Sequence, residues 1–302
     1  MIVDNKTFVG WDASPHSEAA LRWAMKRESD RHGTLALVFV VEDDNDALGA
    51  DEAERQEAEA GAALRDAAAR VKQVVPDCTV TTTTVRGRVV ESLLEFVNDD
   101  WVFAVGAPTG SSVRRLFSLS VGARLAAAAR GPVAVIPESD EVPRSGVVVG
   151  IDGSPASEAA VAFAADEAER IGEPLVFVHA WSEPILMEGQ PILDNQVVEA
   201  LVGESELLLD GARQQALRRT PHVQVSTRSV HGEPSTALVE LADGANQLVL
   251  GSRGLRGIRR VLLGSVSRDT LVRSNCPTIV VGRSPQSLRL TAPTDVGRAL
   301  AH

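Results

Sequence analysis

The chain has 302 residues, 44 % of them apolar, and a formal net charge of −11 at pH 7. This length suits one large domain or two of about 150 residues, and the acidic balance argues against nucleic-acid phosphates or an anionic membrane surface as partners. With two cysteines, no basic leader and no apolar run near the roughly 18 residues that span a bilayer, the sequence predicts a soluble cytoplasmic protein with reduced thiols.

The elements of the first half return, in the same order, in the second half. Residues 8–24 and 148–164 are identical at ten of their seventeen positions. Later segments also match in order: LALVFVV with LVFVHAW, VRGRV with VHGEP, VFAVGAPTG with LVLGSRG, and GPVAVIP with CPTIVVG. The period of about 145 residues is much longer than that of a solenoid repeat, so it indicates duplication of a whole domain.

Polar, proline-containing residues separate the two copies. The sequence predicts a first domain over residues 1–137, a linker over 138–145 and a second domain over 146–283. Residues 284–302 carry no pattern that can pack, so we expect a mobile tail there.

Each copy alternates short β-branched runs with longer helical patterns. In the second copy we expect strands at 146–151, 174–181, 223–230, 246–251 and 277–281, with helices from Pro155, across 193–219 and 233–243, and from Ser265. Strands joined through helices favour parallel pairing with right-handed crossovers. The predicted fold class is therefore α/β, with two tandem doubly wound domains of five parallel strands each. Such sheets bind ligands at the carboxyl ends of their strands, so ligand residues are expected just after the first and fourth strands.

Glycines and a serine follow the fourth strand of the second copy in a pattern that suits a phosphate group. Gly251, Gly254 and Gly264 let backbone N–H groups approach phosphate oxygens, because glycine has no Cβ and adopts positive φ. Ser265 opens a helix, whose N-terminus attracts anions. Asp152 ends the first strand, where its carboxylate can accept a hydrogen bond from a ribose hydroxyl. Four loop arginines could offset phosphate charge: Arg253, Arg256, Arg259 and Arg260.

Taken singly, these features indicate a turn, a helix cap or a solvated surface, and only their combination points to a ligand. The combination resembles the ATP-binding signature of the universal stress proteins, G-x2-G-x9-G-S, and Asp152 matches that family's first-strand aspartate. The resemblance covers residues 6–137 and 145–283. It implies ATP as the ligand, adenine near Ala180 at the end of the second strand, and a contact at Val266 beside the phosphate-binding serine.

The same resemblance implies how the copies assemble. Strands 132–137 and 277–282 are expected to pair within the chain as a pseudo-dimer, and a further homodimer is expected. Mg²⁺ is expected only together with ATP, because no set of residues forms a dedicated metal cage.

The first copy departs from the signature. Asp12, Gly106 and Ser120 match their counterparts and form a possible weak site, but Thr109 replaces Gly254 and Leu119 replaces Gly264. A branched side chain fits poorly where backbone must approach phosphate. We therefore expect the first copy to bind ATP poorly and to serve as a structural or regulatory partner.

Sequence patterns of several enzyme classes are absent. There is no G-x-x-x-x-G-K-[ST], G-x-G-x-x-G, H-x-G-H or G-x-S-x-G segment and no Cys/His cluster with metal spacing. His179 is interpreted as a packing residue and His231 as a surface or capping residue. The resemblance suggests a role in the stress response. Because the sequence offers no identifiable base to position a water for hydrolysis, we expect a non-enzymatic, nucleotide-dependent sensor or regulator. One alternative is an enzyme, either a slow ATPase or an adenylyl- or phosphoryl-transfer enzyme. Another is a dimerising scaffold in which the nucleotide is merely structural. The sequence leaves open whether the ligand is ATP, cAMP or another adenylate, and which protein is the partner.

Overall fold

The computed structural model describes residues 6–29, 33–43, 50–108, 121–138, 143–182, 195–252 and 263–282. In the first half the elements are β1 (Lys6–Gly10), α1 (Pro15–Glu28), β2 (Thr34–Glu42), α2 (Ala50–Val74), β3 (Thr79–Gly87), α3 (Val89–Leu94), β4 (Val102–Ala107), α5 (Val121–Ala128) and β5 (Val133–Pro137). In the second half they are β6 (Val147–Gly150), α6 (Pro155–Ile171), β7 (Leu175–Trp181), α7 (Asn195–Arg219), β8 (Val225–His231), α8 (Pro234–Leu241), β9 (Gln247–Gly251), α9 (Ser265–Arg273) and β10 (Thr278–Val281).

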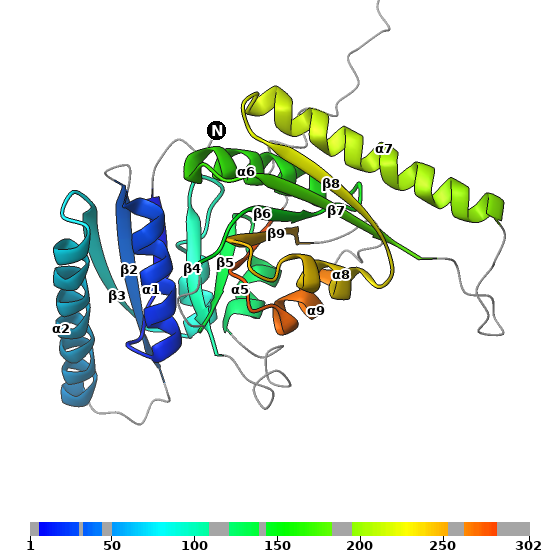
Figure 1. Ribbon diagram of the computed structural model, residues 1–302. Helices are drawn as coiled ribbons and strands as arrows, with labels where there is room; N and C mark the ends of the chain where they lie inside the picture. The colour runs from blue at the N-terminus through cyan, green and yellow to red at the C-terminus, as the bar shows by residue number, and fades with distance from the viewer. Residues whose placement is uncertain are drawn as a thin grey trace, which may run out of the picture.

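All ten of these strands belong to one sheet, in the order β3-β2-β1-β4-β5-β10-β9-β6-β7-β8. In Figure 1 the strands β2 to β5 of the first half lie beside β6 to β9 of the second. Each half contributes five parallel strands in the same relative order. The halves meet where β5 pairs antiparallel with β10, with Ala134 opposite Ile279. The predicted fold class, with its two five-stranded parallel sheets paired within the chain, is confirmed.

The long helices begin where the sequence places their caps. Ser14 and Ser154 each accept a hydrogen bond from the N–H group three residues later, and a proline follows each serine at the first helical position. The α6 helix ends at Gly172, whose φ of 68° is the left-handed conformation that glycine adopts without strain. The predicted helix starts at Pro155 and Ser265 are confirmed, and the predicted strands differ from the observed ones by one or two residues.

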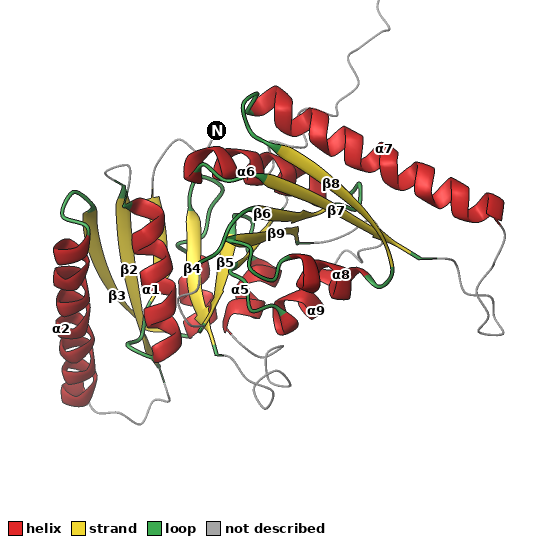
Figure 2. Ribbon diagram, in the orientation of Figure 1, coloured by secondary structure: helices red, strands yellow, loops and turns green. Residues whose placement is uncertain are grey.

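Helices cover both faces of the sheet (Figure 2). The hydrophobic core lies between these helices and the strands. On one face, a single cluster packs α1, α2, α6 and α7 against strands of both halves; it includes Leu21, Leu64, Phe163 and Leu209. On the other face, one cluster lies mainly under α3 and α5 and another lies under α8. The two halves therefore share a continuous core on the first face.

The predicted linker is partly described. Arg144 donates from Nη2 to the Asn275 carbonyl, and the Ser145 N–H donates to the Gly244 carbonyl. These linker residues therefore lie against the second half. Residues 139–142 and the predicted tail over 284–302 lie outside the described residues. None of the helices in the described ranges combines the length and apolarity that crossing a bilayer requires.

Candidate functional site

Three neighbouring strands carry the predicted site residues of the second half to one edge of the sheet. Strand β6 pairs in parallel with both β7 and β9, so their carboxyl ends lie together. Asp152 follows β6, Ala180 lies near the end of β7, and Gly251 ends β9. The topology thus places these three residues at the edge where doubly wound sheets bind ligands.

The start of α9 lies against the end of β9. The Gly264 N–H donates to the Ser252 carbonyl at 2.9 Å, and the Ser267 hydroxyl donates to the Gly251 carbonyl at 2.8 Å. The first turn of α9, with Ser265 and Val266, is therefore fixed at the end of β9. Gly254 and the four loop arginines lie outside the described residues.

The N-terminus of α9 differs from those of α6 and α8. In α6 and α8 the N-cap side chains, Ser154 and Glu233, accept hydrogen bonds from N–H groups of the first turn. The N-cap of α9 is Gly264, which has no side chain to do so, and Ser265 after it is exposed. The first N–H groups of α9 and the Ser265 hydroxyl are thus arranged as an anion-binding helix end requires.

The structure corrects the conformational reason for the glycines. Gly264 has φ −59° and ψ 150°, which any residue adopts, and Gly251 is not among the described glycines with positive φ. A Cβ at Gly251 would instead lie 2.7 Å from the carbonyl carbon of Ala156 and 2.9 Å from the Ser157 nitrogen. Gly251 is therefore required for the close packing of α6 on the end of β9. The positive-φ argument was wrong at both positions.

Asp152 shapes the turn from β6 into α6. Its Oδ1 accepts the Ser154 N–H at 3.0 Å, and its own N–H donates to the Ser157 hydroxyl at 3.3 Å. Between them Gly153 takes a φ of 71°. The carboxylate is half-buried, so one side of it faces solvent at the strand edge.

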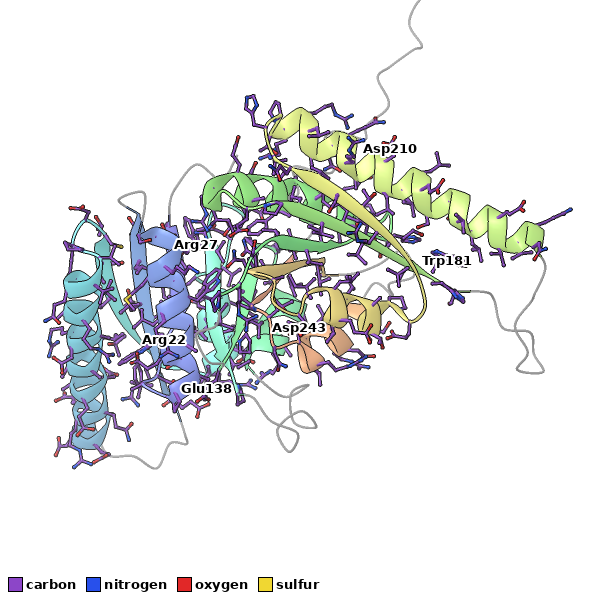
Figure 3. All side chains as sticks on the ribbon, in the orientation of Figure 1. Arg22, Arg27, Glu138, Trp181, Asp210 and Asp243 are labelled. Atoms are coloured by element: carbon purple, nitrogen blue, oxygen red, sulfur yellow. The ribbon has the colours of Figure 1, made fainter. Side chains whose placement is uncertain are left out.

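A polar network beside Ala180 was not predicted. The His179 Nδ1 lies 2.9 Å from the Ser205 hydroxyl, which lies 2.7 Å from the Ser229 hydroxyl. Trp181, labelled in Figure 3, donates from its indole nitrogen to Ser229 at 3.0 Å. Its ring also lies 4.7 Å from that of His231, centroid to centroid. His179 and His231 are thus members of a polar and aromatic group, beyond the packing and surface roles expected of them.

Burial sets the charge of His179. Burial lowers the pKa of its imidazole, and the nearby carboxylates of Glu204 and Asp152 offset this only in part. His179 is therefore neutral at neutral pH. The first half has Phe39 and Ala60 at the positions of His179 and Ser205, so the network is particular to the second half.

The first half contains a cavity of about 740 Å³ at the corresponding strand ends. Trp11, Asp12, Val40 and Gly106 are among the residues that line it, so the first-half candidates Asp12 and Gly106 meet there. A Cβ at Gly106 would lie 2.0 Å from the His16 carbonyl oxygen, which explains the glycine by packing. Ser120 lies outside the described residues, as do residues 183–194 and 253–262 of the second half.

Apart from His16, the ionisable side chains described at this cavity are acidic. Asp12, Glu42 and Glu59 line it, and its described lining includes no lysine or arginine. Burial acts to raise the pKa of Asp12, but hydrogen bonds from Ser14 and Ser17 outweigh it and lower the pKa. The described walls therefore carry negative charge, which disfavours a polyphosphate.

Comparison with known proteins gives one consistent result. A family model described as the universal stress protein family matches residues 5–137 and again residues 144–282. A universal stress protein of Mycobacterium tuberculosis is 34 % identical over 292 residues, which cover 91 % of this chain and 96 % of that protein. One from Mycolicibacterium smegmatis is 31 % identical over 296 residues, covering 90 % and 95 %.

Solved structures share the architecture. A universal stress protein from Archaeoglobus fulgidus superimposes with a TM-score of 0.67 and 19 % identity, over 94 % of this chain and 98 % of that one. At that identity the likeness concerns the fold. A universal stress protein solved in complex with cAMP is 31 % identical and aligns over 47 % of this chain and 100 % of its own, with a TM-score of 0.37.

Proposed function

The chain belongs to the universal stress protein family, with one family domain in each half, and on that premise we propose that its second half binds ATP as a regulatory ligand. The observation that carries the proposal is the N-terminus of α9. It has no side-chain cap, it begins with the exposed Ser265, and it is fixed by hydrogen bonds to the end of β9. A helix end of this kind attracts phosphate through its N–H groups and its dipole.

The remaining site residues take roles that follow from their places on the sheet edge. The backbone of Gly251 and Gly264, together with Gly254 in the loop, approaches the phosphates, and Ser265 donates its hydroxyl. Asp152 accepts a hydrogen bond from a ribose hydroxyl. Ala180 borders the adenine.

Val266 takes part through its backbone. Its side chain packs against the hydrophobic cluster under α8, so its N–H in the first turn of α9 is the group that a phosphate would meet. Mg²⁺ enters only as the partner of ATP. No group of three potential metal-ligating side chains lies together in the described residues.

The first half, in this proposal, holds ATP weakly. Its cavity carries acidic side chains, and Leu119 stands at the position of Gly264. A nucleoside without phosphates suits this cavity better than a triphosphate, because its described walls are otherwise largely apolar. The first half then supports or modulates the ATP site in the second.

We propose a regulator rather than an enzyme. Hydrolysis needs a water held by a base, and the described residues at the α9 end of the site supply a serine and glycines. Turnover is therefore expected below about one per second, the lower end of ordinary enzymes. Faster hydrolysis would favour the alternative, a phosphoryl- or adenylyl-transfer enzyme. Association into a homodimer and a cytoplasmic location stay predictions.

The test is calorimetric ATP binding by the intact chain and by two matched serine variants. Ser265→Asp places a negative charge at the N-terminus of α9, where it stabilises the helix but repels phosphate. Its counterpart in the first half is Ser120→Asp. We expect Ser265→Asp to weaken ATP binding at least about tenfold and Ser120→Asp to leave it unchanged. The reverse result would move the site to the first half, and no binding by the unaltered chain would refute the proposal.

A further inference from the structure

The two halves meet around a local two-fold axis. Pro15 and Pro155 open equivalent helices 140 residues apart, and GPVAVIP matches CPTIVVG 145 residues later. In the β5–β10 pair, Ala134 lies opposite its own counterpart, Ile279. A residue that faces its own counterpart lies on the axis that relates the halves.

A second pair of counterparts meets on this axis, and it is charged. Arg27 near the end of α1 and Glu167 in α6 occupy equivalent positions, 140 residues apart. The Arg27 Nε donates to Glu167 Oε1 at 3.2 Å and its Nη2 donates to Oε2 at 2.9 Å. The two side chains are 4 % and 1 % exposed. Figure 3 labels Arg27 where α1 approaches α6.

Neighbouring groups complete this cluster. The Arg27 Nη1 donates to Glu28 at 2.7 Å and to the Thr7 hydroxyl at 2.9 Å. From the second half, Arg170 donates to both oxygens of Glu167 and to the Arg27 carbonyl. Despite burial, which raises it, the charge of Arg27 and the hydrogen bonds of Arg170 bring the pKa of the Glu167 carboxyl down to about 2. Both members of the pair are therefore charged.

We propose that the Arg27–Glu167 pair makes this face selective, so that the first half fits the second half and neither fits a copy of itself. If two first halves met in the same way, Arg27 would face Arg27. If two second halves met, Glu167 would face Glu167. Like charges that are buried together repel each other without the screening that water gives. Selectivity of this kind needs such a repulsive element against the wrong partner.

The neighbouring charges do not remove this discrimination. Glu28 occupies the Nη1 edge of Arg27, while the Nε and Nη2 donors depend on Glu167. A buried donor without an acceptor is costly, so pairing of two first halves is disfavoured on two counts. Glu167 would keep Arg170 in a pair of second halves, so that pairing is disfavoured by repulsion alone.

The side chains of the paired strands discriminate little between the possible partners. The paired strand residues are small or β-branched in both halves: Val133, Ala134 and Val135 face Val280, Ile279 and Thr278. Such residues would pair almost as well with a copy of their own strand. One further position also distinguishes the halves. A Cβ at Gly282 would lie 2.0 Å from the Arg130 carbonyl oxygen, and the counterpart of Gly282 is Pro137, so a pair of first halves would also meet a steric conflict there.

The test asks whether the two halves still choose each other once the chain no longer joins them. A protease site placed within residues 139–142, between β5 and β6, lets the folded chain be cut into its halves. The cut protein is then taken through denaturant and back, and native mass spectrometry counts mixed and like pairs. We expect almost only mixed pairs from the unaltered chain. In Arg27→Gln/Glu167→Gln, the share of mixed pairs should fall towards the half that random choice gives. A variant that stays as selective as the unaltered chain, or an unaltered chain that pairs at random, would overturn the proposal.

Unfolding of the uncut chain gives an independent test that does not require the halves to recombine. Arg27→Glu and Glu167→Arg each put like charges on the axis, so each should lower the urea midpoint of unfolding. The exchanged variant Arg27→Glu/Glu167→Arg restores opposite charges and should recover part of the combined loss. The proposal would be overturned if the two decreases in midpoint simply added in the exchanged variant, or if neither single variant lowered the midpoint.

Discussion

One alanine in the turn after β1 is held in a conformation that alanine disfavours. Ala13 has a φ of 63°, and among the described residues no other non-glycine residue has positive φ. Its counterpart in the second half is Gly153, with a φ of 71°. The left-handed conformation costs a residue with a Cβ about 1–2 kcal/mol. Ala13→Gly removes this strain, at the cost of up to about 1 kcal/mol from the greater freedom of glycine in the unfolded chain.

The expected net effect of Ala13→Gly is a gain in stability of about 0.5–1 kcal/mol. The reciprocal change, Gly153→Ala, introduces the same strain and brings a Cβ to 2.7 Å from Leu208 Cδ2. Because Leu208 can move, we expect a loss of about 1–2 kcal/mol. Urea unfolding followed by circular dichroism measures both, provided that the slope with urea is unchanged. A loss of stability in Ala13→Gly would show that the backbone at Ala13 is not strained and would refute the reasoning.

Three further predictions concern packing, acid and thiols. Gly106→Ala and Gly251→Ala each push a Cβ into the backbone of a neighbouring helix, so each should lower the free energy of unfolding by about 2 kcal/mol or more. Gly106→Ala should be the more destabilising, because its Cβ would lie only 2.0 Å from the nearest backbone atom. The control Gly211→Ala, on the open face of α7, should gain up to about 1 kcal/mol in the same urea titration. The pKa of Glu167 falls from 4.5 to about 2 on folding, so the stability that this carboxylate contributes is present above pH 4.5 and is lost as the pH falls towards 2. The urea midpoint, measured at pH 7, 5 and 3, should therefore fall less steeply with decreasing pH in Glu167→Gln than in the unaltered chain. An equal fall in both proteins would contradict the low pKa of Glu167. Burial raises the pKa of the Cys276 thiol to about 12, so iodoacetamide at pH 8 should label it only after unfolding, and rapid labelling of the folded chain would be inconsistent with this burial.

The fold could be predicted from local signals. Serine followed by proline marks the starts of α1 and α6, and buried β-branched runs mark the strands. The internal repeat indicates that both halves have the same fold. The resemblance to the family then predicted that β5 pairs with β10. These features depend on residues close together in sequence or on the duplication itself.

The candidate site could be predicted only in part. The order of elements was enough to place Asp152 and Gly251 on one edge of the sheet, and the resemblance added Ala180. The network of His179, Ser205 and Ser229 has no local signature, because its members come from three different elements. A comparison of the two copies gives the available signal, since Phe39 and Ala60 replace the first two of these residues.

Two other features depend on packing that a sequence does not display. The glycine at 251 is explained by its contact with the first turn of α6, almost 100 residues earlier. The Arg27–Glu167 pair joins residues 140 positions apart, and each residue alone is typical of a solvated helix face. Their burial follows from the meeting of the two halves.

The central claim is that the loop before α9 decides which half binds ATP. The direct measurement is the number of ATP molecules bound per chain, by calorimetry, in the unaltered protein, in Gly264→Leu and in Thr109→Gly/Leu119→Gly. Leucine fits the backbone at Gly264, where φ is −59°, so the first variant tests the approach of phosphate rather than the fold. The account predicts one ATP in the unaltered chain, none in Gly264→Leu, and at most weak additional binding in the variant that gives the first half the glycines of the second, because the acidic side chains of the first-half cavity remain. Binding that survives Gly264→Leu unchanged would contradict it.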